Sequence, residues 1–529
     1  MGQRGDVADT VSRRRGYGVR PAAEDTLMRE MSRPRTLFVD WITGLNPRLM
    51  VVVIAAVAAA CGIGIAVGLA VLGPLYTSAA VVGGLAGLYV LTNAQAALYG
   101  VVAIMALLPF GTLPFSIGFT PTLIDVMIGA FLIVYGAQWM VGKRNDFRTT
   151  PVHGMLALYV LWILACFVLG LRYAAPTSLI LRQFSETILI MLLVFVLVDL
   201  LRDPKMLRRL VLVVILCVGV QAVAALVLYR LPDDLAERLL RTLQRIGYPG
   251  SNIIRYIEQN PGLPERAIGT WVDPNTLGGA LAIAGAMIAP QVFARRPVLR
   301  YRVLTLAVLG LIGLALFLTY SRTSMLALGV GLGTIALVRY RRFVPLMLAA
   351  GALILLVPQA QDYVQRFIDA FTGGDLATQM RIGEYGDSLK LIGQYPIFGI
   401  GFTGSPSIDL YSSVASMYLI MANQIGLVGV ALFALVMIAV LGYGYAAWKR
   451  VIGDDELESI HLGYHAALIA ALVNGIGDLY YFRIDFQASI LLFWLTVSLA
   501  LATSRIALAR ESKAPPSLRD GGAGDRVDH

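Results

Sequence analysis

Apolar runs of roughly 17 to 25 residues without a charge recur along this chain, and each is long enough to cross a hydrocarbon layer about 30 Å thick. In such a layer only helices satisfy their own backbone polar groups at lipid-exposed positions. The composition agrees, since 57% of the 529 residues are hydrophobic and only 14% are charged. The sequence therefore predicts an all-α, polytopic integral membrane protein with about 14 transmembrane helices, in a range of about 12 to 14.

The predicted spans divide the chain into seven parts. These are a basic cytoplasmic tail (1–46), N-terminal transmembrane helices (47–229), an extracytoplasmic loop (230–274), further transmembrane helices (275–358), a large extracytoplasmic loop (359–413), C-terminal transmembrane helices (414–506) and a disordered cytoplasmic tail (507–529). The individual spans are expected at 49–71, 76–93, 96–112, 121–141, 152–171, 184–201, 207–229, 275–294, 303–320, 323–338, 343–358, 414–446 (broken near Gly426), 461–479 and 486–506.

The positive charge indicates the orientation of these spans. The net charge is +10, and most of the 43 Lys and Arg residues fall in the two tails and in alternate short loops. Such loops remain in the cytoplasm, so both termini are expected inside the plasma (inner) membrane of a bacterium. This distribution accounts for the basic charge as a topology signal, and no nucleic-acid partner is expected.

Two long connections on the outer side are expected to contain surface helices. In the first, Leu231, Leu235, Leu239, Leu243 and Ile246 recur at helical spacing, with arginines between them. In the second, an apolar stripe runs from Val364 to Phe371. Both patterns are typical of helices that lie on the membrane surface. Packing against the protein's own spans is the alternative.

The cysteines do not indicate a metal or redox centre. Cys61, Cys166 and Cys217 all lie inside apolar runs and lack the spacing of metal ligands. Free cysteine in such a setting acts as a small buried apolar residue. No metal and no cofactor are predicted.

Arginines on the outer side oppose the charge rule and need another explanation. Arg182, Arg266 and Arg322 stand where predicted spans meet water, and Arg381 lies in the second outer connection. Guanidinium groups stay charged and match phosphate oxygens in a bidentate manner. A cluster of them would suit a lipid diphosphate. Alternatively, some of these side chains reach lipid head groups singly.

Two carboxylates near these arginines have both a catalytic and a structural interpretation. If 379–393 is helical, Arg381, Glu384 and Ser388 share one face, so a cation lies beside a carboxylate. A surface ion pair is the alternative for Glu384, and more so for Asp387. Asp273, followed by Pro and Asn, has the pattern of a helix start as well as that of a functional acid.

Four segments together resemble the bacterial O-antigen ligase and O-antigen (Wzy-type) polysaccharide polymerase superfamily. They are RAIGTWVDPNTL from Arg266, LTYSRT at 318–323, the stretch from Arg381 to Phe402 with PIFGIG, and NQIGLVG from Asn423. The resemblance covers residues 180–445. It implies a GT-C-like membrane glycosyltransferase with two large extracytoplasmic loops, which uses an undecaprenyl-diphosphate-linked glycan on the outer face of the membrane and needs no metal.

One departure bears on the reaction. Ligases of this family resemble one another in a His-Asn pair in the large outer loop, but this chain reads YSSVASMY at 411–418. Its histidines are His153, His461, His465 and His529, none of them expected outside. The resemblance therefore favours a polymerase of lipid-linked repeat units for O-antigen or exopolysaccharide. The alternatives are ligase-type transfer of the glycan to a lipid or protein acceptor, a lipid-linked glycan flippase or transporter, and a non-enzymatic scaffold for polysaccharide export.

Each candidate residue receives a role under the polymerase interpretation. Transfer expels lipid diphosphate, whose charge Arg266 and Arg381 would stabilise, and Glu384 is the expected proton acceptor. The partners would be lipid-linked donor and acceptor, membrane lipids, and polysaccharide export or chain-length-control proteins. The substrate-binding candidates are Arg182, Arg322, Asp273, Tyr385 and Asp387.

Overall fold

The computed structural model describes residues 87–113, 119–250, 253–354, 376–404 and 414–511, with isolated residues between 52 and 86 and residue 361. The chain divides into two compact units, Met1–Gly87 and Leu88–His529, and the site lies wholly in the second. The predicted span 49–71 falls mainly outside the described residues, and the predicted span 76–93 falls partly outside them. The predicted surface helix at 364–371 lies outside them entirely.

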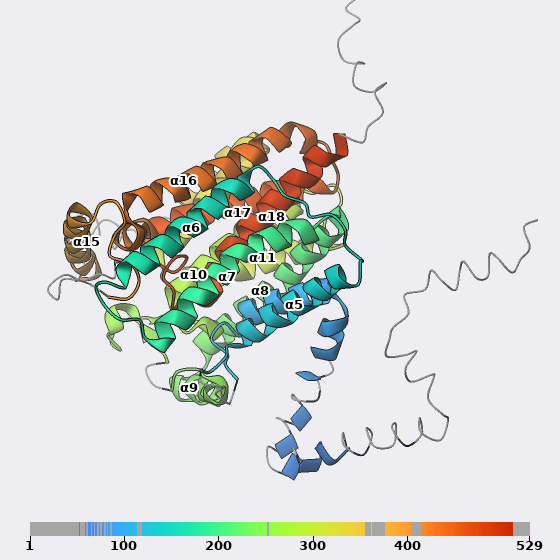
Figure 1. Ribbon diagram of the computed structural model, residues 1–529. Helices are drawn as coiled ribbons and strands as arrows, with labels where there is room; N and C mark the ends of the chain where they lie inside the picture. Colours follow the sequence, from blue (N-terminus) through green and yellow to red (C-terminus); the bar gives the residue numbers. More distant parts are fainter. Residues whose placement is uncertain are drawn as a thin grey trace, which may run out of the picture. The chain divides into compact units, whose positions relative to one another are not determined.

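The second unit is a helical bundle. In Figure 1 its long helices run alongside one another, and α9 and α15 lie at one end. The α-helices are α4 (Ala94–Leu107), α5 (Leu123–Met140), α6 (Val152–Gly170), α7 (Ser178–Leu200), α8 (Pro204–Arg230), α9 (Asp233–Thr242), α10 (Pro274–Ile288), α11 (Arg302–Leu318), α12 (Arg322–Val338), α13 (Val344–Ile354), α15 (Leu376–Gln394), α16 (Met417–Val451), α17 (Leu457–Gly477) and α18 (Gln487–Glu511).

Short elements complete the connections between the long helices. Strands β1 (Arg255–Tyr256) and β2 (Glu265–Arg266) pair antiparallel, with Arg255 opposite Arg266. The 3-10 helices are η1 (Leu243–Ile246), η2 (Ile257–Gln259), η3 (Gly269–Trp271), η4 (Ala289–Val292) and η5 (Arg341–Phe343).

Within the described residues, seven helices are long and apolar enough to cross a membrane: α5, α6, α7, α8, α16, α17 and α18. The shorter apolar helices are α4, α11 and α12. The chain is therefore a mostly helical, multi-pass membrane protein, as its composition predicts. A total of about 14 spans and a GT-C-like architecture go beyond this finding and remain predictions.

Helices α10, α17 and α18 form the centre of the bundle. From Thr276 to Ile288 every residue of α10 is buried, and the most apolar window of α18 is buried throughout. Helix α10 packs against α17, α12 and α11, while α18 packs against α7, α16 and α17. A helix that is apolar all round belongs in such a position, because neighbouring helices cover every face.

The basic loops gather at one end of the bundle. Arg144 pairs with Asp199 at 2.8 Å, and Arg202 bridges Asp146 and Asp199 at 2.6 and 2.5 Å. Arg339 pairs with Glu458 at the same end. These contacts bring together the short loops whose positive charge predicts a cytoplasmic position.

The opposite end contains the long connections. Thr112 donates its amide to the Ile246 carbonyl at 2.7 Å, and Met417 donates its amide to the Asp478 carbonyl at 2.9 Å. The four segments that resemble the ligase and polymerase family also lie at this end.

Candidate functional site

The two C-terminal family-like segments pack directly against each other. Ile400 and Gly401 donate their amides to the carbonyls of Asn423 and Gln424, at 2.8 and 3.0 Å. Helix α16 is interrupted at Gly426, where φ is 70° and ψ is 175°, as its sequence predicts. A Cβ on Gly426 would lie 2.0 Å from the Ile397 carbonyl oxygen. Glycine is thus required at this position both for its backbone conformation and for the close approach of the two segments.

Helix α15 holds the start of α16 through side-chain contacts. Glu384 Oε2 accepts a hydrogen bond from the Ala415 amide at 3.2 Å, and the Tyr385 hydroxyl donates to the Ala415 carbonyl at 3.3 Å. The buried Ser388 hydroxyl donates to Asn423 Oδ1 at 2.9 Å. Glu384 and Ser388 therefore lie on one face of α15, as predicted, but the Glu384 carboxylate is bonded to the Ala415 amide. Asp387 instead forms a 3.1 Å ion pair with Lys390 at the surface. This contact agrees with the surface-ion-pair alternative for Asp387.

Arg266 joins the two N-terminal family-like segments. Its Nε donates to the Thr319 carbonyl at 2.8 Å, and its Nη2 donates to Asn275 Oδ1 at 2.6 Å. The amide of Ala267 donates to the Leu318 carbonyl at 2.8 Å. These bonds fix the plane of the guanidinium group. Arg322, another predicted site arginine, is the first residue of α12 and follows shortly after Thr319, which Arg266 contacts.

Backbone strain occurs in both of these segments. Val272 has φ 60° and Tyr320 has φ 54°, although neither is glycine. A positive φ costs on the order of 1–3 kcal/mol for such residues and persists only where surrounding contacts impose it. The two strained residues lie within the segments that Arg266 connects, in the pattern that is common at functional sites.

Asp273 caps the N-terminus of α10. Its Oδ1 accepts hydrogen bonds from the amides of Asn275 and Thr276, both at 2.9 Å, and Pro274 occupies the first helical position. This arrangement matches the helix-start interpretation of the sequence. Its charge nevertheless contributes to the site, because it acts on a second carboxyl group.

That second group is Asp478, which the sequence analysis did not single out. It follows the last residue of α17 and is 3% exposed. Within the described residues its Oδ2 is buried and has no hydrogen-bond partner. Burial raises the pKa of this carboxyl to about 8, Arg381 and Arg266 oppose the rise, and Asp273 adds to it.

The charges of these three candidate residues therefore all act on Asp478. The carboxyl of Asp478 is within electrostatic range of arginines from two distant segments, one on β2 and one on α15. Tyr480 lies beside it, and Asn275 Nδ2 donates to the Tyr480 hydroxyl at 3.5 Å. The one sequence signal for Asp478 is an acid placed directly after an apolar span that ends Asn-Gly-Ile-Gly.

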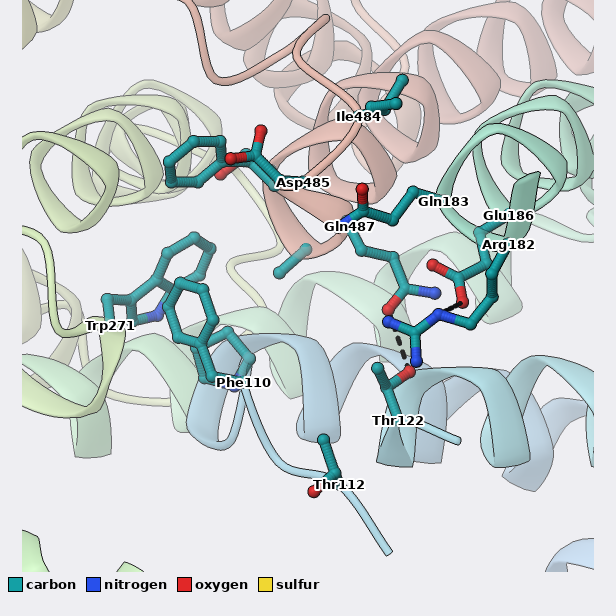
Figure 2. Close-up of a pocket in the computed structure, with 14 residues that line it drawn as sticks. Phe110, Thr112, Thr122, Arg182, Gln183, Glu186, Trp271, Ile484, Asp485 and Gln487 are labelled. Atoms are coloured by element: carbon teal, nitrogen blue, oxygen red, sulfur yellow. Dashed lines mark hydrogen bonds and ion pairs between the residues drawn. The ribbon is translucent and has the colours of Figure 1, made fainter. Parts of the chain in front are cut away.

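Arg182 belongs to a separate pocket of about 160 Å³ at the same end of the bundle. Its Nε lies 3.0 Å from Glu186 Oε1, and its Nη1 donates to the Thr120 carbonyl at 2.5 Å. Figure 2 shows this pair on one side of the pocket and Trp271 with Phe110 on the other. The structure thus places Arg182 apart from the surroundings of Asp478.

The histidines in the described part of the chain form no hydrogen bond or ion pair with these groups. His153 Nδ1 accepts from the Thr150 amide at 3.0 Å, and the rings of His461 and His465 lie with centroids 4.1 Å apart. Their partners belong to the end of the bundle with the basic loops. Over the same ranges, no three His, Cys, Asp or Glu side chains are grouped as metal ligands.

The fold and the site define a class: a multi-pass helical membrane protein with an arginine-flanked, buried carboxyl group at one end. Residues 306–434 match the sequence model of a family described as O-Antigen ligase. This match confirms the resemblance to the ligase and polymerase superfamily over α11 to the first part of α16. It includes Arg322, Arg381, Glu384 and Gly426.

Two further comparisons add little. No curated protein matches the chain. A solved chain, from a structure titled "Structural coordination of polymerization and crosslinking by a peptidoglycan synthase complex", is 20% identical, with a TM-score of 0.35, over 66% of this chain and 96% of that chain. A TM-score this low does not establish a common fold.

Proposed function

We propose that this protein is a membrane glycosyltransferase that polymerises undecaprenyl-diphosphate-linked glycan repeat units into cell-surface polysaccharide. The observation that carries the proposal is that the positive charges of Arg266 and Arg381 both act on the buried carboxyl of Asp478 and oppose the rise in its pKa that burial causes. Preorganised cations beside a group able to take up a proton are what transfer from a lipid diphosphate requires. The family match over residues 306–434 supports the same reaction class.

The chemistry assigns one role to each charged group. A hydroxyl of the acceptor glycan attacks the anomeric carbon of the donor, forming a new C–O bond as the bond to the diphosphate oxygen breaks. The electron pair leaves with the lipid diphosphate, whose charge Arg266 and Arg381 stabilise, with Arg322 in support. The hydroxyl proton passes to a carboxylate, and we assign that role to Asp478.

Asp478 replaces Glu384 as the proton acceptor for two reasons. Glu384 is half-buried and already accepts the Ala415 amide, which favours a role in positioning the start of α16. Asp478 has a buried oxygen without a partner among the described residues and a pKa raised to about 8. A base whose pKa lies near working pH is the more effective one.

The proposed location is the bacterial plasma membrane, with both termini in the cytoplasm and the site on the extracytoplasmic face. The support is the separation of the two ends of the bundle, one carrying the basic short loops and the other the long connections and the candidate site. Lipid-linked donor and acceptor would both enter from the outer leaflet.

Ligation is the second candidate function, because the matching family is described as O-Antigen ligase. Polymerisation is favoured by the absence of histidine between Phe402 and Met417 in the sequence, where the resemblance places the base of a ligase. The transport alternative is less well supported, because the ionisable residues of the site stand at helix ends, not in the middle of the spans.

Surface glycan from a strain that lacks the protein tests the proposal. Complementation with Arg266→Ala or Arg381→Ala should leave single repeat units on the lipid carrier, whereas Arg238→Ala, at an exposed position on α9, should restore long chains. Finished polymer that is not attached to its acceptor would indicate ligation instead. Normal glycan from both site variants would contradict the assigned roles.

A further inference from the structure

The pocket that contains Arg182 has no role in the reaction described above. It lies between the beginnings of α5, α7 and α18 and the η3 segment, and its volume is about 160 Å³. A buried cavity of about 150 Å³ is enough to hold a six-membered carbon ring. The pocket is therefore the size of a single sugar ring and too small for a diphosphate with its attached lipid.

The charges around this pocket are already paired. Arg182 Nε lies 3.0 Å from Glu186 Oε1, and Arg483 Nε lies 2.8 Å from Asp485 Oδ1. An anion that entered would meet two carboxylates and a single arginine that is engaged with one of them. Charge pairing of this kind favours a neutral ligand and argues against the sequence-based prediction that Arg182 binds phosphate.

The uncharged groups that line the pocket are those that a sugar needs. Figure 2 shows Trp271 and Phe110 facing the polar side, with Gln487 between the two sides. Gln487 accepts from the Thr122 hydroxyl at 2.9 Å and donates to Asp125 at 2.5 Å, so its amide is held in place. In the described part of the chain, the Gln183 side chain lines the pocket and forms no hydrogen bond. Flat aromatic faces cover the C–H side of a pyranose, while amides and hydroxyls bind its hydroxyl groups.

The pocket is connected by chain to the proposed transfer site. The segment of Arg266 continues into Trp271, and the segment of Asp478 continues into Asp485. Two lining segments therefore begin at the groups assigned to diphosphate and proton transfer. In a lipid-linked glycan the sugars are joined directly to the diphosphate, so a sugar site connected by these two segments to Arg266 and Asp478 fits the substrate.

We propose that the pocket formed by Phe110, Gln183, Trp271, Asp485 and Gln487 is a binding site for one neutral pyranose ring of the glycan substrate. This inference rests on the proposed function for the identity of the ligand. Arg182 and Glu186 then act as a fixed pair that shapes the wall of the site, and the diphosphate binds elsewhere, at Arg266 and Arg381.

Saturation-transfer NMR on the full-length protein in lipid nanodiscs tests the proposal. The probes are methyl α-D-glucopyranoside, methyl α-D-galactopyranoside, methyl α-D-mannopyranoside, methyl α-L-rhamnopyranoside and N-acetylglucosamine, with empty nanodiscs as the blank and pyrophosphate as the competing anion. At least one pyranoside should give a saturable signal that pyrophosphate does not displace. Gln183→Leu should weaken this binding about tenfold, which corresponds to the loss of one hydrogen bond.

The matched control is Gln394→Leu, which changes an exposed glutamine on α15 and should bind the pyranoside as the wild type does. Failure of every pyranoside to bind the wild type, displacement by pyrophosphate, or unchanged binding by Gln183→Leu would each overturn the proposal. The two proposals fail separately. If the wild type binds a pyranoside but Arg266→Ala restores normal glycan, the transferase proposal fails and the sugar site stands. If no pyranoside binds but Arg266→Ala leaves single repeat units, the sugar site fails and the transferase proposal stands.

Discussion

The amide of Leu427 donates a 2.7 Å hydrogen bond to the carbonyl of Pro396, across the break in α16. This bond exists because Gly426 leaves the helical conformation and frees a backbone donor for the segment that precedes α16 in the chain. The segment at 396–402 in turn reaches α6, where a Cβ on Gly401 would lie 2.6 Å from the Gly170 Cα. The connection between α15 and α16 is thus held on two sides by glycine contacts.

Gly426→Ala should destabilise this arrangement strongly. The added Cβ would lie 2.0 Å from the Ile397 carbonyl oxygen at a φ of 70°, so both sterics and backbone conformation oppose it. We expect a loss of about 3 kcal/mol or more in stability, with loss of polymerisation. Thermal unfolding in detergent measures the effect. Gly442→Ala, on the same helix with open space around its Cβ, should unfold as the wild type does. Equal melting temperatures for the two variants would contradict the role of Gly426.

Sequence patterns predicted the membrane helices and the α16 break because both follow from local rules. Uncharged runs determine where helices cross the membrane, and glycine marks a backbone position that other residues avoid. The α15 face that Glu384 and Ser388 share follows from helical periodicity in the same way. Each of these features depends on residues close together in the chain.

Asp478 and the partner of Arg182 depend on tertiary contacts that no local pattern contains. Asp478 is important because the charges of Arg266 on β2 and Arg381 on α15 act on it at the end of α17, and its sequence context is a short apolar segment. Arg182 satisfies the outer-arginine pattern as well as Arg266 does. Only the position of Glu186 one helical turn away, together with the Thr120 carbonyl, shows that its guanidinium group already has partners.

Asp478→Asn should abolish most of the activity and its pH dependence. As a proton acceptor Asp478 works in its ionised form, so wild-type activity should increase as pH rises through about 8, where the carboxyl loses its proton. The amide variant should lose about 10²- to 10⁴-fold and show a flat profile over the same range. The measurement is polymerisation of purified lipid-linked repeat units between pH 6 and 9. A variant that keeps the wild-type profile would return the role of base to another residue.

Asp478→Asn should lower activity but raise stability at high pH. A carboxyl whose folded pKa is raised from 3.8 to about 8 holds a proton that the unfolded chain releases, so wild-type stability should fall as pH rises between these values. Asp478→Asn removes this loss, and its melting temperature should exceed that of the wild type at pH 9. Asp387→Asn, at a surface ion pair, is the control and should follow the wild type.

Asp273→Asn should move the pH profile without removing activity. Asparagine caps a helix about as well as aspartate, so α10 should keep its start. The lost negative charge, however, contributes to the raised pKa of Asp478, and its removal should shift the activity profile toward lower pH. Asp273→Ala differs, because it also removes the cap at a cost of about 1 kcal/mol. An unshifted profile for Asp273→Asn would show that the two carboxyl groups do not interact.

Arg266→Lys tests whether the guanidinium plane is needed in addition to the charge. Arg266 donates from Nε to Thr319 and from Nη2 to Asn275, and a single ammonium nitrogen cannot occupy both positions. Loss of one charge-assisted hydrogen bond, about 1.5–3 kcal/mol, corresponds to a roughly tenfold to hundredfold lower kcat/KM. Asn275→Leu should produce a loss of similar size with the arginine intact, because it removes one of the two acceptors that orient the group. If Arg266→Lys retained full activity while Arg266→Ala had none, positive charge alone would be sufficient and the oriented fork would have no role in transfer.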